Sequence, residues 1–64
     1  MSMHRASLDS AAATIDDLVI RVTMVADHFE TEGEEGLAND LYEVERSLQA
    51  AARRLHHVVR ELES

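Results

Sequence analysis

The spacing of apolar residues constrains this chain more than any other feature of its sequence. In the first half, apolar side chains recur at alternating steps of three and four residues, at Leu8, Ala11, Ile15, Leu18, Val22, Val25 and Phe29. In the second half, the same alternation gives Leu37, Leu41, Val44, Leu48, Ala51, Leu55, Val58 and Leu62. Such steps place side chains on one face of an α-helix, whereas a β-strand alternates at every second residue. The sequence therefore predicts an all-α fold of two long amphipathic helices.

A short segment with glycine separates the two repeats. Gly33 and Gly36 are the only two glycines, and the chain has no proline. Glycine is common just after a helix because it adopts positive φ without a steric clash. Glu34 and Glu35 suit the start of a second helix, where the helix dipole is positive. We therefore expect a turn over residues 33–36, and a connection this short makes the helices antiparallel.

The 64 residues predict a single helical-hairpin domain. Residues 1–6 show no apolar pattern, so we expect a frayed tail there. Ser7 is a favourable N-cap and Asp9 suits a first helical turn, which predicts a helix over about residues 7–32. The second repeat predicts a helix over about residues 36–63. Each helix should be about 36–40 Å long, so the two can contact each other along their whole length.

Each apolar stripe is three positions wide. The additional residues are Ala12, Val19 and Ala26 in the first stripe and Ala38, Ala52 and Val59 in the second. A two-position seam would satisfy a simple coiled coil, whereas a wider stripe is typical of helices in a bundle. We therefore expect one side of each stripe to face the sister helix and the alanine-rich flank to face another molecule.

The predicted assembly is a homodimer of antiparallel hairpins, forming a four-helix bundle, with a hetero-oligomeric bundle as the alternative. A chain this short buries only about 60% of its unfolded surface when it folds alone, so an isolated hairpin would have a small core. The residues expected at the oligomer interface are Ile15, Leu18, Val19, Val22, Val25, Phe29, Leu41, Val44, Leu48, Leu55, Val58 and Val59.

The composition argues against several classes of function. There is no cysteine for a disulfide or a thiolate metal site. There is no Gly-rich phosphate loop and no strand–turn–helix segment to position a nucleophile, so we expect no enzymatic activity and no cofactor. The longest apolar runs are three residues, which predicts no membrane span and no secretory signal. We therefore expect a cytoplasmic protein, and the use of arginine without lysine favours a GC-rich bacterial source.

Two features outside the stripes are candidate partner-binding sites. Ile20 and Met24 are four residues apart and should lie together on the outer face of the first helix, where a partner helix could dock. Arg46, Arg53 and Arg60 recur every seven residues and should form a line on the outer face of the second helix. Guanidinium groups in a line could bind an acidic helix or a phosphate backbone, although a solvated face explains the same pattern.

The leading hypothesis is a non-enzymatic interaction or oligomerisation module, such as an adaptor, regulator or assembly subunit, that binds itself and another protein. The first alternative is a nucleic-acid-binding regulator that uses the arginine face of the second helix, Arg46, Arg53, Arg54 and Arg60, which the net charge of −7 opposes. The second is a metal-binding bundle that uses His28, His57 and the glutamates four residues after each, Glu32 and Glu61. Exposed histidines without a metal are the simpler interpretation of that spacing.

Overall fold

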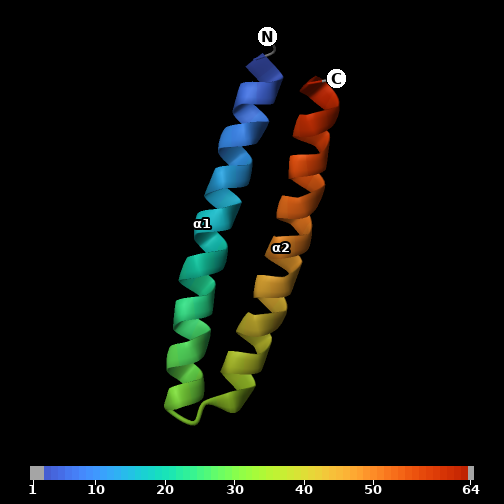
Figure 1. The fold of residues 1–64 in the computed structure, drawn as a ribbon. Helices are drawn as coiled ribbons and strands as arrows, with labels where there is room; N and C mark the ends of the chain where they lie inside the picture. The colour runs from blue at the N-terminus through green and yellow to red at the C-terminus, as the bar shows by residue number, and fades with distance from the viewer. Residues whose placement is uncertain (1–2, 64) are drawn as a thin grey trace.

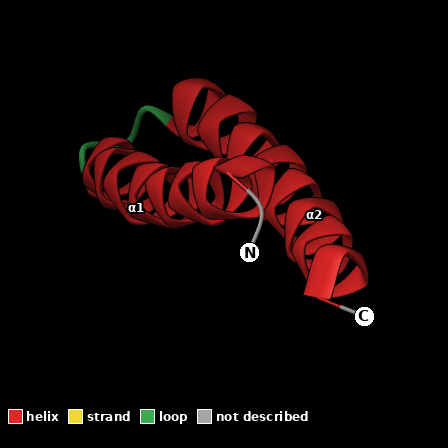
Figure 2. Cartoon of the chain, turned by 90° about the horizontal axis from the view of Figure 1, so that it is seen from above, coloured by secondary structure: helices red, strands yellow, loops and turns green. Residues whose placement is uncertain are grey.

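The computed structural model describes residues 3–63, which form two helices joined by a tight turn. Helix α1 spans Met3–Thr31 and helix α2 spans Glu35–Glu63. The helices are antiparallel and lie side by side along their length, so that α1 begins where α2 ends (Figure 1). The view from above shows helix throughout the described residues except at the connecting loop (Figure 2). The predicted all-α helical hairpin is confirmed.

Helix α1 begins at Met3, four residues before the predicted N-cap at Ser7. The expected frayed tail over residues 1–6 is therefore wrong from Met3 onward, and the two residues before Met3 lie outside the described part of the chain. Arg5 supplies a physical reason, because its Nε donates a hydrogen bond of 2.9 Å to Oε1 of Glu63 on α2. This ion pair ties the first turn of α1 to the last turn of α2 and supports helical structure before Ser7.

The turn is a Schellman motif with Gly33 in the left-handed conformation, at a φ of +81°. The N–H of Glu34 donates a hydrogen bond of 2.9 Å to the carbonyl oxygen of Phe29. The N–H of Gly33 donates one of 3.1 Å to the carbonyl oxygen of Glu30. These two bonds satisfy carbonyl groups that the end of a helix would otherwise leave unpaired. The predicted role of Gly33 as the residue that ends the first helix is confirmed.

Gly36 lies in the first turn of α2, which begins at Glu35. The carbonyl oxygen of Glu34 accepts a hydrogen bond of 3.0 Å from the N–H of Ala38, so Glu34 is the N-cap of this helix. The predicted turn over residues 33–36 therefore extends too far at its C-terminal end.

Small residues build the contact between the two helices. The buried apolar residues are Ala12, Ala26, Ala38, Ala52 and Val59, which are at most 6% exposed. Among the described residues, no large side chain is completely shielded from solvent. The expectation that the alanine-rich flank faces another molecule is therefore wrong. Small side chains let the two helix axes approach closely, and this leaves the larger side chains of each stripe at the edge of the contact.

Candidate interaction surface

The most extensive candidate site is an apolar surface along one side of the hairpin, which we call the open apolar face. It comprises Leu8, Ala11, Ile15, Leu18, Val22, Val25 and Phe29 of α1, and Leu37, Leu41, Val44, Leu48, Ala51, Leu55, Val58 and Leu62 of α2. Most of these positions lie three or six residues after a member of the buried line, which is Ala12, Val19 and Ala26 in α1 and Ala38, Glu45, Ala52 and Val59 in α2. Because the helices are antiparallel, the same offset places both sets on one side of the hairpin.

The outer edge of this face is exposed to solvent. On this edge, Val25, Leu37, Val44 and Val58 are between 42% and 50% exposed, and Leu62 at the end of α2 is 46% exposed. The line nearer the sister helix, which runs through Ile15, Val22, Leu48 and Leu55 among others, is half-buried. The hairpin therefore covers only the inner part of its own apolar stripe.

The predicted interface residues divide between two surfaces. Val59 is buried against the sister helix, and Val19 lies on the corresponding line of α1. The other members of the predicted set belong to the open apolar face. The heptad pattern thus located the apolar surface, but it did not separate the residues used within the hairpin from those left available to a partner.

The accessible area shows how much surface a partner could cover. The hairpin exposes 4830 Å². A compact monomer of 7.2 kDa would expose about 4100 Å². The difference of about 700 Å² is close to the roughly 800 Å² that each partner buries in a standard protein–protein interface. The hairpin therefore exposes enough additional surface to form an interface of standard size.

The opposite side of the hairpin, which we call the polar flank, carries contacts between polar side chains of the two helices. Near the turn, the hydroxyl of Tyr42 lies 2.6 Å from Oδ1 of Asp27 and 2.7 Å from Oε2 of Glu30. The single phenolic hydrogen is shared between the two carboxylates. These hydrogen bonds, that with Asp27 first, raise the pKa of Tyr42 well above its ordinary value. Tyr42 therefore links α2 to α1 in its neutral form.

Farther from the turn, a polar side chain interrupts the buried line of α2. Glu45 occupies the position between Ala38 and Ala52 on that line and is half-buried. Its carboxylate accepts a hydrogen bond from the hydroxyl of Thr23 on α1. This bond satisfies a group that would otherwise be costly to place between two helices.

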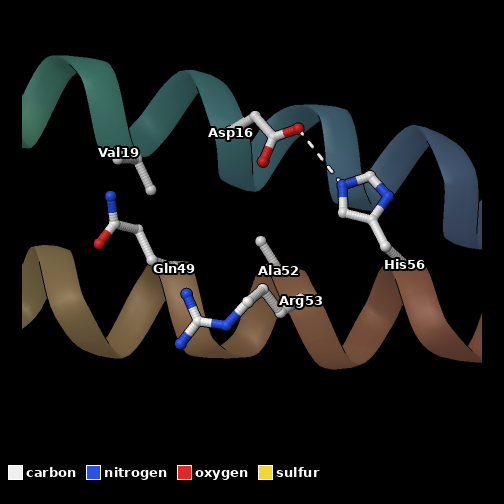
Figure 3. Close-up of a pocket in the computed structure, with 6 residues that line it drawn as sticks. All are labelled: Asp16, Val19, Gln49, Ala52, Arg53 and His56. Carbon is white, nitrogen blue, oxygen red and sulfur yellow. Dashed lines mark ion pairs between the residues drawn. The ribbon is translucent and has the colours of Figure 1, made fainter.

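A shallow groove crosses the polar flank nearer the helix ends. Figure 3 shows that Asp16 and Val19 of α1 line it together with Gln49, Ala52, Arg53 and His56 of α2. Nε2 of His56 lies 3.5 Å from Oδ2 of Asp16, so the pair bridges the helices. The polar groups of this groove therefore contribute to holding the hairpin together.

The two partner-binding candidates from the sequence lie away from the open apolar face. Ile20 and Met24 are 60% and 67% exposed on the outer side of α1. Arg46 forms an ion pair with Glu43, one turn earlier on α2. Arg53 lines the groove of the polar flank, and Arg60 is exposed one heptad farther along α2.

The histidines proposed as metal ligands each have a glutamate beside them on the same helix. Nε2 of His28 lies 3.2 Å from Oε1 of Glu32, and Nε2 of His57 lies 3.8 Å from Oε1 of Glu61. Within residues 3–63, no three histidine, cysteine or acidic side chains are placed to hold a metal ion together. Each pair is therefore an exposed contact within one helix.

Neither helix, over the residues that the structure covers, has the combination of length and apolar character needed to cross a membrane. Comparisons with protein-family models, with curated proteins and with solved structures gave no match to this chain. The surfaces of the hairpin are therefore the basis on which its function can be inferred.

Proposed function

We propose that this chain is a non-enzymatic interaction module that acts as a homodimer, in which the open apolar faces of two hairpins pack together as a four-helix bundle. The observation that carries this proposal is the open apolar face itself. It runs along both helices, and its outer residues, such as Val25 and Val44, are nearly half exposed. Contiguous apolar surface of this extent on a small protein is typical of an interaction site.

A second copy of the chain is the partner that fits this face. The two helices are 29 residues each, so a second hairpin presents an apolar surface of matching length. The residues of the open apolar face include no ionisable side chain, so two such faces can meet without burying a charge. The excess surface of about 700 Å² per chain is also close to the roughly 800 Å² that each partner buries in a dimer of standard size.

The dimer would act as an adaptor, a small regulator or an assembly subunit. Packing the open apolar faces together leaves the outer side of α1 in contact with solvent. Ile20 and Met24 would then remain exposed and could receive a second, different protein.

Two adjacent residues allow a matched test of the dimer. Val25 and Met24 are both exposed, but only Val25 belongs to the open apolar face. Sedimentation equilibrium of the unmodified chain should give twice the chain mass of 7.2 kDa. Val25→Glu would bury an unpaired carboxylate twice in each dimer, so we expect dimerisation to weaken by at least roughly 100-fold. Met24→Glu should leave the dimer unchanged.

Circular dichroism on the same samples separates loss of the dimer from loss of the helices. The proposal fails if the unmodified chain is a helical monomer at concentrations where standard interfaces are formed. It also fails if Val25→Glu dimerises as strongly as Met24→Glu, because the open apolar face would then not be the interface.

A further inference from the structure

We infer that the two hairpins of the dimer lie with their turns at opposite ends, so that the turn of each copy lies beside the helix ends of the other. This inference rests on the proposed dimer and selects between the two arrangements that bring the open apolar faces together. A two-fold axis parallel to the helices would place both turns at the same end. A two-fold axis perpendicular to the helices, lying between the two faces, places them at opposite ends.

The distribution of charge along the hairpin favours opposite ends. The half nearer the turn, residues 20–46, carries eight acidic residues and two arginines, a net charge of −6. The other half, residues 3–19 and 47–63, carries five acidic residues and four arginines, a net charge of −1. With both turns at one end, the two strongly acidic halves would adjoin. With the turns at opposite ends, each acidic half adjoins a nearly neutral one.

This difference is felt at physiological salt. Packed helices lie about 8–10 Å apart, and the screening length at physiological ionic strength is about 8 Å. Charges on neighbouring helices are therefore only partly screened from each other. The opposite-end arrangement does bring Asp40 towards Glu61 of the second copy, because both flank the open apolar face of α2. One exposed pair of like charge contributes little compared with the repulsion between two halves of net charge −6.

The sizes of the core side chains favour the same arrangement. On the open apolar face, Phe29 and Leu41 form a bulky layer near the turn, and Ala11 and Val58 form a thin layer near the other end. With the turns together, a second Phe29 would join the bulkiest layer and a second Ala11 would join the thinnest. With the turns apart, the layer of Phe29 meets the Leu8–Leu62 layer of the second copy, and the layer of Ala11 meets the Val25–Val44 layer.

The symmetry of the chain makes this match possible without a shift of register. In the sequence, the layers of the open apolar face follow alternating steps of three and four residues in both helices, from Leu8 and Leu62 at one end to Phe29 and Leu41 at the other. Reversing one hairpin therefore superimposes layer on layer. Interiors are packed to nearly constant density, so even layers are favoured over alternating bulky and thin ones.

The chain contains no cysteine, so single labels can test the arrangement directly. A nitroxide attached through Glu34→Cys would report the distance between the two turns of a full-length dimer by pulsed electron paramagnetic resonance. The chain is 49 Å long, and each helix contributes about 43 Å of rise. We expect a distance between labels on the order of 40–50 Å, whereas turns at the same end would give less than about 25 Å.

A label at Ala50→Cys is the matched control. Ala50 is exposed near the middle of α2, so it lies at a similar height in both arrangements and reports the dimer alone. A dipolar signal at Ala50 with a short distance at Glu34 would overturn the inferred arrangement and leave the proposed function standing. Loss of the signal at both sites would overturn the dimer and the arrangement together. A second turn label, Glu32→Cys, guards against an effect of Glu34→Cys on the turn.

Discussion

Exchange of the two glycines for alanine should change the stability of the hairpin in opposite directions. Gly33 has a φ of +81°, which costs an L-residue roughly 1–2 kcal/mol. No atom lies within 4 Å of a Cβ built at Gly33, so the cost of Gly33→Ala is conformational and not steric. Alanine also restricts the unfolded chain, which offsets about 0.4–1 kcal/mol. The expected net loss for Gly33→Ala is therefore about 1 kcal/mol.

Gly36 provides the matched comparison because it is helical and a Cβ there also meets open space. Gly36→Ala should stabilise the chain by about 0.4–1 kcal/mol. Both variants should be compared by urea and thermal denaturation followed by circular dichroism, at one chain concentration, because dimerisation would make the midpoint depend on concentration. A change of 1 kcal/mol corresponds to roughly 4–8 °C in a chain of this size. If the two substitutions shift stability in the same direction, the assignment of Gly33 to the turn and Gly36 to α2 is refuted.

Two further predictions concern the polar flank and the contact between the helices. Ultraviolet titration should give Tyr42 a higher midpoint in the folded chain than in urea, and Asp27→Asn should lower the midpoint of the folded chain. Because folding raises the pKa of Tyr42, the stability that its hydrogen bonds contribute is present below the unfolded pKa. This contribution is lost as pH rises through the folded pKa. An unchanged midpoint in Asp27→Asn would contradict the hydrogen bond. Ala26→Leu should destabilise the hairpin by about 1–3 kcal/mol in urea denaturation because Ala26 is fully buried, whereas Ala50→Leu on the exposed side should change stability by less than about 0.5 kcal/mol. Equal effects of the two substitutions would argue against the tight contact.

The periodicity of the sequence predicted the helices well because it depends on local geometry. The predicted end of the first helix lies within one residue of Thr31, and the second helix ends at Glu63 as expected. The left-handed turn at Gly33 was also predictable, since few residues other than glycine adopt that conformation. Gly36 was misplaced because a glycine in a first helical turn and a glycine in a loop look the same in sequence.

The orientation of the apolar stripe could not be predicted in the same way. Ala12 and Leu18 each belong to a line of apolar residues that recurs every seven positions, and the pattern does not say which line faces the sister helix. Which line faces the sister helix depends on how closely the two helix axes approach. It also depends on contacts between residues far apart in the sequence, such as Thr23 and Glu45, which are 22 residues apart. The early start of α1 likewise depends on Arg5 and Glu63, which are far apart in the sequence and meet at the open end of the hairpin.

The cross-helix contacts also define an order in which the chain can close on itself. Tyr42 lies only 12 residues from Glu30, whereas Arg5 lies 58 residues from Glu63. The entropy lost on closing a loop grows with its length, so contacts beside the turn form most readily in an open chain. Once these form, each later contact closes only a few additional residues, and the helices can pair progressively from Gly33 outward. Among amide hydrogens bonded within a helix, those near the turn should then exchange more slowly than those near the Arg5–Glu63 end, because that end would open first.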